Sequence, residues 1–552
     1  MACQYLLDRQ DAFPARTHLA LRRVRETLRT WREGEIGGEA IPHGSRGPVA
    51  LLFPNTYAVG MANIGVHWVW RAVNDFAEDG EHPFACERFF LDHLPALSVE
   101  SERSLSDFPL ILVSCAFELD YWNIARALLA AGIPLRARDR AREGGPVVVI
   151  GGLCTSVNRL PLLEFADAFA IGDGERALPL ILHAWLRAGG EREPFLDHIE
   201  GRAGLEVPPR FTEAERARLI PDVARPEPSC VSESDCSTQI LSPHAEFPGR
   251  ALIEISRGCP YRCQFCYVGH RMRPYRNRSL DQIWRAVERW RPHTDLFGFV
   301  SSAVASHHQI DDLCRRCLDE GLKVSFSSLR AEDLTPLMVE TLVASDQRTL
   351  TLAPEVASPR LRPLIHKEID DETLETVIGE CVRRGIENIK LYYMFGLPGE
   401  SDDDAMAIVS QAERLRSLMT DLQRSSGRLG ELSLNIGIFV PKAGTPLAGH
   451  ALWDPGGIRK RRQRLLRAVR QIPNTRAAIS GLEEAQLQCL VSMGGFETGD
   501  LLESLALDAR SWKRHLRDAF PAWRERYNAE RTAPPPVFKL PGGKRRVRLT
   551  VE

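Results

Sequence analysis

The sequence predicts an α/β protein with a doubly wound, Rossmann-like parallel-sheet domain, a partial (β/α)6 barrel and a helical region near the C-terminus. Two observations predict this class. Short apolar runs such as 146–150 alternate with amphipathic helical segments, which is typical of parallel strands covered on both faces. A Pro- and Ser-rich stretch without periodicity, 221–236, separates two such series and indicates a connector.

We expect five segments, which follow from these changes of pattern along the 552 residues. They are an N-terminal helical extension (1–47), the doubly wound domain (48–204), a linker (205–248), the barrel (249–450) and a helical C-terminal region with a basic tail (451–552). In the extension, apolar residues at helical spacing alternate with arginines, which predicts a packing helix with a solvated basic face. The basic tail at 544–548 is expected to be solvated or to form an edge strand.

The doubly wound domain is predicted from four apolar runs that read as strands: 49–53, 110–114, 146–150 and 168–171. Ligands of such sheets bind beyond the carboxyl ends of the strands. The candidate binding loops are therefore those that follow the runs: 54–60, 114–120, 151–158 and 172–175.

The barrel is predicted from a second series of strands: 251–255, 296–300, 323–326, 349–352, 388–394 and 432–440. Helical segments separate them: 280–291, 309–319, 334–344, 370–384 and 402–421. Six strands with helical crossovers predict a barrel or partial barrel, in which chemistry occurs at the carboxyl ends of the strands.

Composition excludes several classes of protein. Because 44% of residues are apolar, wholesale disorder is excluded, and the formal net charge of −2 argues against a dedicated polyanion binder but leaves local basic patches open. The first residues lack the pattern of a signal peptide and no apolar run could span a bilayer, so we expect a cytoplasmic protein. The 13 scattered cysteines point to buried thiols, metal ligands or catalysis before disulfides.

The strongest chemical signal is the C-x3-C-x2-C motif formed by Cys259, Cys263 and Cys266, directly after the first barrel strand. Close thiolates on a tight loop suit an iron–sulfur cluster or zinc. Structural zinc sites usually take four ligands, whereas three cysteines on a four-iron cluster leave one iron open. An open iron at the end of a barrel strand is a reaction site, so we favour the cluster, with zinc or inert thiols as alternatives.

With Phe265 at the aromatic position, this motif resembles the C-x3-C-x-aromatic-C signature of the radical S-adenosylmethionine superfamily. The resemblance runs through most of residues 48–450 and is closest to the branch with an N-terminal cobalamin-binding-like domain. The segments that carry it are 57–65, 171–175, 257–279, 352–358, 360–362, 365–367, 389–400 and 439–446.

The resemblance implies that the three cysteines hold a 4Fe-4S cluster whose open iron binds the amino and carboxylate groups of S-adenosylmethionine. One electron then cleaves the sulfonium to methionine and a deoxyadenosyl radical, which abstracts hydrogen from a substrate. A reducing partner such as flavodoxin or ferredoxin is therefore expected. The substrate is not indicated, and nucleic acid stays open as a partner.

Two cofactor-binding candidates follow from the fourth and fifth strands. Glu355 would accept hydrogen bonds from the ribose or the amino group of S-adenosylmethionine. Its alternative is an ion pair with Arg360 or Arg362. Gly396 would permit close approach of the backbone to the adenine, or would form a plain turn.

Three more candidates end the second and third strands. Members of the superfamily often carry Gly-Gly-Glu after the second strand, where this chain has Ser301 and Ser302, so the hydroxyl of Ser302 is a substitute candidate. Ser327 and Arg330 follow the third strand. The guanidinium of Arg330 suits the carboxylate of the cofactor, and a structural ion pair is its alternative.

Cobalamin is a further candidate cofactor, and it would imply methyl transfer to an unactivated carbon. Many cobalamin domains carry Asp-x-His-x-x-Gly, whose histidine binds cobalt. This chain has no such motif, because Asp92 and His93 are contiguous and neither His67 nor His82 has the spacing. A degenerate domain without cobalamin is the alternative.

Two other functions stay open. The related tRNA methylthiotransferases hold a second cluster on three N-terminal cysteines, and Cys86, Cys115 and Cys154 are candidates for it. Their surroundings do not match that family's first motif, and no clear nucleic-acid domain follows the barrel. A non-catalytic iron–sulfur or corrin sensor is the second alternative.

Overall fold

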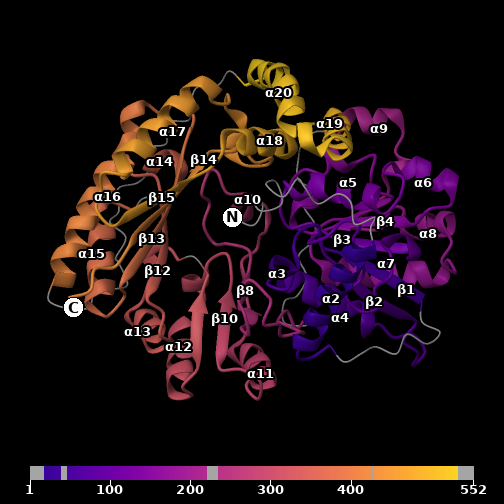
Figure 1. The fold of residues 1–552 in the computed structure, drawn as a ribbon, viewed down its shortest axis with the longest axis horizontal. Helices are drawn as coiled ribbons and strands as arrows, with labels where there is room; N and C mark the ends of the chain where they lie inside the picture. The colour runs from indigo at the N-terminus through magenta and orange to yellow at the C-terminus, as the bar shows by residue number, and fades with distance from the viewer. Residues whose placement is uncertain are drawn as a thin grey trace. The chain divides into compact units, whose positions relative to one another are not determined.

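The computed structural model describes residues 18–38, 47–219, 234–327, 329–367, 369–424 and 427–531. Most of the predicted connector (221–236) and the whole basic tail (544–548) lie outside these residues. The chain forms two compact units (Figure 1). Unit 1 comprises Met1–Ile253, Pro292–Thr294 and Leu487–Phe520, and unit 2 comprises Glu254–Arg291, Asp295–Gln486 and Pro521–Glu552. The five segment boundaries stay predictions.

Unit 1 is built on a six-stranded sheet in the order β2-β1-β3-β4-β5-β6. Its strands are β1 (Gly47–Leu52), β2 (Phe84–Phe89), β3 (Leu110–Ser114), β4 (Val147–Gly151), β5 (Ala168–Ala170) and β6 (Leu205–Glu206). All neighbouring pairs are parallel except β5 and β6. The order of the parallel strands is that of a doubly wound sheet, so the predicted fold class is confirmed for this unit.

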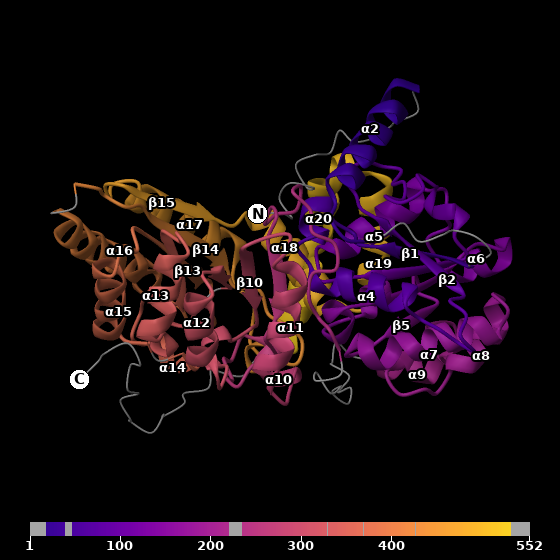
Figure 2. The same ribbon diagram turned by 90° about the horizontal axis from the view of Figure 1, so that it is seen from below.

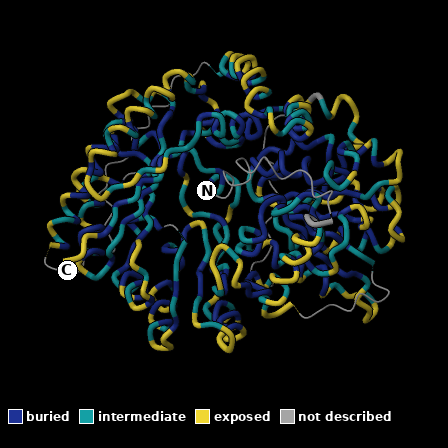
Figure 3. The backbone as a smooth tube through the Cα atoms, in the orientation of Figure 1, coloured by how far each residue is buried: buried dark blue, intermediate teal, exposed yellow. Residues whose placement is uncertain are grey.

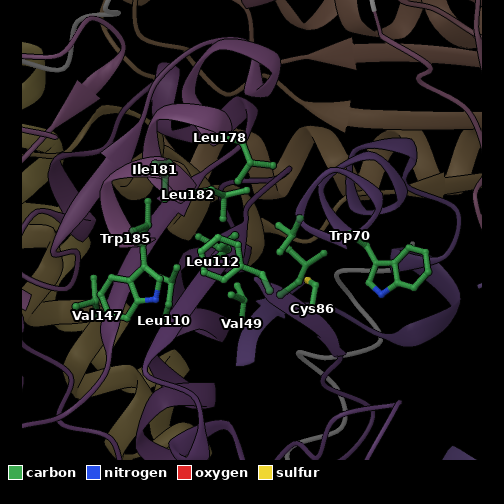
Figure 4. Packing of buried hydrophobic residues seen from close by; sticks show 14 of the residues in the cluster. Val49, Trp70, Cys86, Leu110, Leu112, Val147, Leu178, Ile181, Leu182 and Trp185 are labelled. Atoms are coloured by element: carbon green, nitrogen blue, oxygen red, sulfur yellow. The ribbon is translucent and has the colours of Figure 1, made fainter. Parts of the chain in front are cut away.

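One helix precedes these strands, α2 (His18–Gly34), and one follows them, α9 (Glu213–Arg218). The helices between the strands are α3 (Tyr57–Gly60), α4 (Ile64–Asn74), α5 (Asp120–Ala130), α6 (Ala137–Glu143), α7 (Gly174–Arg187) and α8 (Arg192–Ile199). Figure 4 shows how the core forms, with apolar side chains of three strands facing one side of α7. The strand residues are Val49, Leu110, Leu112 and Val147, and the helix residues are Leu178, Ile181, Leu182 and Trp185. Parallel strands that are apolar on both faces require such cover.

The strand β2 was not predicted, because its sequence contains the charged pair Glu87-Arg88. The structure buries both side chains and gives each a partner. The Arg88 guanidinium binds the Glu35 carboxylate at 2.8 Å and the Glu100 carboxylate at 2.6 Å. The Glu87 carboxylate accepts a hydrogen bond from Ser101. Paired charges are tolerated inside a sheet, so tertiary contacts override the local pattern here.

All six strands predicted for the barrel are present; five lie in unit 2, and the division between the units falls within β7. They form a three-stranded sheet, β11-β10-β7, and part of a four-stranded sheet, β12-β13-β14-β15, linked by a parallel bridge between Leu329 and Leu352. The strands are β7 (Ala251–Glu254), β10 (Leu296–Val300), β11 (Lys323–Phe326), β12 (Thr349–Glu355), β13 (Asn388–Phe395) and β14 (Leu432–Ile438). The short strands β8 (Ser256–Arg257) and β9 (Arg276–Asn277) pair antiparallel.

A seventh strand, β15 (Thr475–Ile479), extends the second sheet parallel to β14. The prediction of a mainly helical chain after residue 450 missed it. The segment is short and alanine-rich, so its own sequence favours a strand weakly, and its pairing with β14 determines its conformation.

The helices of unit 2 are α10 (Tyr267–Arg271), α11 (Leu280–Trp290), α12 (Ile310–Asp319), α13 (Pro336–Ala344), α14 (Arg362–Ile365), α15 (Asp371–Arg383), α16 (Asp402–Gln423) and α17 (Pro455–Val469). Of these, α15, α16 and α17 lie side by side along the second sheet (Figure 1 and Figure 2). Along β13 every second residue is buried. In Figure 3 the colour for exposed residues lies mainly along the outer helices and loops. The hydroxyl of Tyr393 donates to Gln411 of α16, so the buried side faces the helices and Tyr392 faces the barrel interior.

Three further helices follow β15: α18 (Leu482–Met493), α19 (Glu497–Leu507) and α20 (Trp512–Ala529). The division between the units falls within α18 and within α20. None of the helices in the described ranges combines the length and apolar character that crossing a lipid bilayer requires.

We predict that Asp167→Ala destabilises unit 1 by about 3–5 kcal/mol, because it leaves the Arg140 guanidinium buried without its counter-charge. Arg140 and Asp167 are 0% and 1% exposed and their side chains are 2.8 Å apart. Asp167 also accepts from the backbone N–H of Val148. Urea denaturation measures the change. The control is Glu143→Ala, which removes an exposed ion pair with Arg142 and is expected to cost under about 1 kcal/mol. Equal effects of the two substitutions would contradict the assignment.

Candidate functional site

The cysteine loop begins at an ion-pair network on β7. The Glu254 carboxylate binds the Arg257 guanidinium through two hydrogen bonds, at 2.8 and 2.9 Å, and also accepts from Arg278 at 2.6 Å. Burial would raise the pKa of Glu254, but the two guanidinium groups outweigh it and hold the pKa below its usual range. The residue that starts the loop, Arg257, is therefore fixed to the strand.

Two glycines allow the loop to close tightly. Gly258 has φ +82°, and a Cβ there would collide with the carbonyl oxygen of Met272. A Cβ at Gly269 would collide with the carbonyl oxygen of Tyr261. Only glycine fits at these positions, so backbone from both sides of the motif packs against itself.

The three predicted thiols lie on this loop. Cys263 is buried, while Cys259 and Cys266 are half-buried. Burial raises the pKa of the Cys259 and Cys266 thiols, and the charges of the neighbouring cysteines raise it further. Thiolates so close together need a positive centre to hold them deprotonated.

The centre of the loop is held by two neighbouring strand-end loops. The backbone N–H of Gln264 donates to the carbonyl of Ile365 at 3.1 Å, and its carbonyl accepts from the N–H of Leu447 at 3.2 Å. The side-chain amide of Gln264 contacts Nδ1 of His366 at 2.7 Å. The next residue, Phe265, packs against an apolar cluster that includes Ile365 and Leu447. The motif is thereby fixed to the loops that follow β12 and β14.

Arg330 lies beside the cysteines, as the sequence predicts. Its Nη1 is 3.5 Å from Sγ of Cys263, and the guanidinium lies 4.0 Å from the ring centroid of Tyr261. It also pairs with Glu332 and, at 3.6 Å, with Asp333. The structure therefore shows the ion pairs named as its alternative, while Nη1 of the same guanidinium contacts the Cys263 thiol.

Glu355 ends β12 and has a strained backbone. Its φ is +69°, and the register of β12 against β13 shifts between Leu352 and Glu355. A non-glycine residue keeps such a conformation only where its surroundings impose it. The carboxylate binds Nζ of Lys367 at 3.1 Å, and Lys367 is 5% exposed. The charge of Glu355 acts on the Cys266 thiol, so the pair lies near the cysteines.

Sequence reasoning assigned no role to Lys367, although Lys367 lies in a motif segment. Neither expected alternative partner binds Glu355: Arg360 pairs with Asp404, and Arg362 pairs with Asp371. The two arginines hold the loop after β12 against α15 and α16. Lys367 alone supplies the counter-charge to Glu355 among the ion pairs of the described residues.

A hydroxyl network joins the ends of the first three barrel strands. Ser327 donates to the carbonyl of Ser301 at 2.8 Å, and the hydroxyls of Ser301 and Ser256 are 2.6 Å apart. Tyr275 donates to Ser256 at 3.0 Å. The candidate Ser302 is exposed and lies outside this network, so Ser301 is the serine of the pair that the structure connects to Ser327.

Gly396 follows β13 with φ +88°. A Cβ there would lie 2.8 Å from Ile458 and 3.2 Å from Trp453. Its N–H donates to the Glu400 carboxylate. The structure thus gives this glycine a packing role, and its predicted contact with adenine stays a prediction.

Taken together, the donor set fits a cluster with an exchangeable corner. The cysteine loop offers three thiols, and the segments at the ends of β11 and β12 add the cation of Arg330 and the pair of Glu355 with Lys367. Within the described ranges, no three His, Cys, Asp or Glu side chains stand in the arrangement of a metal-ion site. The fit therefore rests on the chemistry of the donors and on the glycine cradle.

The strand ends of unit 1 carry a second set of polar groups. The amide of Asn55, after β1, donates to the Asp120 carboxylate, after β3, at 2.9 Å. Burial raises the pKa of Asp120 to about 7 against the opposing effect of the Asn55 and Asn123 amides. Within the same unit, Asn158 donates to the carbonyls of Val491 and Gly494. Residues of α18 thus cover the loop that follows β4.

The four candidate binding loops of unit 1 contain no histidine that could bind the cobalt of a corrin. His67 lies on α4, with its ring nitrogens directed to the carbonyl of Met61 and the N–H of Gln239. Burial lowers its pKa to about 4. It serves as a buried structural residue.

The three N-terminal cysteines do not converge. Cys115 and Cys154 interact through their side chains at the strand ends and are fully buried. Cys86 lies in the core, where it pairs in register with Val49, which in turn pairs with Leu110. Cys115 stands five residues beyond Leu110 along β3, about 16 Å away in the strand direction. Cys86 could join the other two only if β2 left the sheet.

We predict that Asp120→Asn stabilises the protein more at high pH than at low pH. The folded-state pKa is raised, so the unfolded chain loses the proton first and the wild type loses stability as pH rises from about 4 to about 7. Asp120→Asn has no carboxyl group to titrate at this position, so the variant does not lose stability in this way. Its free energy of unfolding relative to wild type should be about 2 kcal/mol larger at pH 8 than at pH 5 in urea titrations. The exposed Asp75→Asn is the control, and a pH-independent difference for Asp120→Asn would contradict the raised pKa.

Two family models match the chain. The model for the N-terminal region of radical SAM proteins matches residues 65–208, and that of the radical SAM superfamily matches residues 253–412, which include every candidate site residue of the barrel. An uncharacterized protein of Methanocaldococcus jannaschii is 24% identical over 402 residues, covering 72% of this chain and 78% of that protein. The ribosomal protein uS12 methylthiotransferase of Synechococcus is 23% identical over 240 residues, covering 40% of this chain and 46% of that protein.

Among solved structures, the radical S-adenosylmethionine methyltransferase TsrM of Kitasatospora setae shares the fold. The TM-score is 0.52 at 15% identity, over 86% of this chain and 99% of that one. The cofactors common to the family are a 4Fe-4S cluster and S-adenosylmethionine. From the two matched regions and the cysteine motif, the chain belongs to the radical S-adenosylmethionine superfamily.

Proposed function

We propose that this protein is a radical S-adenosylmethionine methyltransferase that acts on an unactivated carbon, with cobalamin held by unit 1. The observation that carries the proposal is the gathering of Cys259, Cys263 and Cys266 with Arg330 and the Glu355–Lys367 pair at the strand ends of unit 2. When bound, the cluster and S-adenosylmethionine supply hydrogen-atom abstraction. A one-electron donor of the flavodoxin or ferredoxin class supplies the electron.

The residues of unit 2 bind and orient the cofactor. The three cysteines hold the cluster, and Arg330 stabilises negative charge on the sulfur of Cys263. Glu355 accepts hydrogen bonds from the ribose or the amino group, while Lys367 keeps it ionised and aimed. The network of Ser301 and Ser327 fixes the neighbouring strand ends. The inward-facing Tyr392 borders the space where the substrate would enter.

Support for methyl transfer comes from the combination of the two units. A doubly wound sheet precedes the barrel in the same chain, and the chain shares the fold of a radical S-adenosylmethionine methyltransferase over 86% of its length. Cobalamin would supply a carrier for the methyl group at the strand ends of unit 1. The loops there contain no histidine, so cobalt would have no imidazole ligand from them.

The geometry argues against the two alternatives. Methylthio transfer needs a second cluster, and the burial of Cys86 in the core leaves only Cys115 and Cys154 together. A non-catalytic sensor would have no use for the ion pair of Glu355 and Lys367, held by a strained backbone beside the cysteines. Both features favour an enzyme with a single cluster.

We predict that replacing Cys259, Cys263 or Cys266 by alanine removes the cluster and lowers deoxyadenosine release by more than about 100-fold. The assay is anaerobic reconstitution followed by reductant and S-adenosylmethionine, with iron and sulfide measured alongside.

Two double variants serve as controls. Cys314→Ala with Cys317→Ala removes buried thiols on α12, and Cys115→Ala with Cys154→Ala removes the thiol pair of unit 1. Both should keep the iron content of wild type. A loss of about one cluster from the second variant would instead support methylthio transfer.

We predict that protein produced with the vitamin carries cobalamin, with the absorbance of a corrin that lacks an imidazole ligand. The spectrum of the purified protein, before and after gel filtration, measures this. The matched control is the unit 1 variant His67→Gln, which should keep the same spectrum because both ring nitrogens of the buried His67 are already engaged, by the carbonyl of Met61 and the N–H of Gln239. Absence of corrin from wild type would contradict the methyl carrier and leave hydrogen abstraction untouched.

A further inference from the structure

One segment of unit 2 differs in charge from the rest of the chain. From Pro455 to Leu482 there are eight Arg and Lys residues and no Asp or Glu, although the whole chain has a net charge of −2. The segment contains α17, the turn after it and β15. Its charge is therefore a local property that the overall composition conceals.

The helix separates its charges from its apolar residues. Ile458, Leu465 and Val469 are buried against unit 2. The exposed Arg, Lys and Gln side chains along the helix and just after it fall within an arc of about 140° at 100° per residue. They are Arg459, Lys460, Gln463, Arg464, Arg467, Arg470 and Gln471.

Some of the cations are engaged within the protein. Arg461 binds Glu400 and Asp402, Arg464 binds Asp402, and Arg462 donates to the carbonyl of Ser480. The contacts of Arg461 and Arg464 fasten the helix to the segment between β13 and the start of α16, and the carboxylates there balance their charge. The contact of Arg462 fastens the helix to the residue that follows β15.

Four others are not engaged. Arg459, Lys460, Arg467 and Arg470 have no hydrogen-bond or ion-pair partner for their side chains anywhere in the part of the chain that the structure describes. They extend along α17 from Arg459, near the start of the helix, to Arg470, which follows the last helical residue, Val469. From Arg459 to Arg470 the rise is about 16 Å at 1.5 Å per residue.

The row begins beside the functional end of the barrel. The Glu400 carboxylate that binds Arg461 also accepts from the N–H of Gly396, which follows β13. The indole of Trp453, just before the helix, donates to the carbonyl of Phe439, which follows β14. A polyanion bound along the row would thus reach the carboxyl ends of two barrel strands.

We propose that the exposed face of α17 binds the phosphate backbone of a single-stranded nucleic acid. Guanidinium groups fit phosphate oxygens through paired hydrogen bonds, and a row about 16 Å long spans several successive phosphates. The two glutamines in the arc can reach sugars or bases. A membrane surface is disfavoured because Ile458, Leu465 and Val469 are buried, and the exposed arc of α17 contains no large apolar residue to insert between lipids.

The experiment measures binding of the full-length protein to fluorescein-labelled RNA and DNA of the same sequence, about 20 nucleotides long, by fluorescence anisotropy between about 50 and 200 mM salt. The variant carries R459Q, K460Q, R467Q and R470Q. Each lost contact with a phosphate should lower the salt slope by about 0.7, so the slope should fall by up to about 3 and binding at 50 mM salt should weaken at least tenfold. RNA and DNA arms show which polymer is preferred.

The matched control removes the same charge from the exposed basic face of α2, with R22Q, R23Q, R25Q and R29Q. It should keep the wild-type slope. Both variants should unfold at the wild-type temperature, since the substituted side chains are exposed. The proposal is overturned if the wild type binds neither polymer at low salt or if both variants weaken binding equally. It is also overturned if the α17 substitutions leave binding to RNA and DNA unchanged and weaken only binding to phosphatidylglycerol vesicles. The experiment measures binding and not deoxyadenosine release, so its outcome is independent of the proposed reaction.

Discussion

The site depends on how one residue, Gln264, is held. Its backbone N–H and carbonyl bind two loops that follow different barrel strands, and its neighbours in the chain are a cysteine and the packed Phe265. A cysteine loop without these bonds would be free to move, and three thiols would not keep common positions. Because each bond joins the motif to a loop that follows a barrel strand, the barrel determines where the three cysteines stand. The ion pair of Glu254 with Arg257 fixes the entry to the loop in the same way.

Several buried charges in this protein are paired with an opposite charge. Arg88 and Arg140 in unit 1 each meet a buried carboxylate. In unit 2 the pair of Glu355 and Lys367 follows the same rule but adds a strained backbone and the nearby Cys266. Breaking such pairs is costly, so both members are held in one geometry. The unpaired cations of α17 depart from this rule at the surface, where pairing is not needed for stability.

Much of the fold follows from hydrophobic period, because apolar runs and amphipathic helices alternate over both units. The strand β2 escaped prediction since Glu87 and Arg88 find partners only in the folded protein. The strand β15 escaped since its pairing with β14, not its composition, determines it. At the site, spacing sufficed to find the three cysteines. Lys367 could not be found, because its contact with Glu355 depends on the positive φ of that residue. The separation of Cys86 from Cys115 likewise required the register of three strands.

The central claim is that the three cysteines leave one iron of a cluster open to S-adenosylmethionine. Electron paramagnetic resonance of the anaerobic, dithionite-reduced protein tests it most directly. Addition of S-adenosylmethionine should change the g values of the cluster signal, because its amino and carboxylate groups bind the open iron. A reduced cluster whose spectrum is identical with and without S-adenosylmethionine would contradict the account.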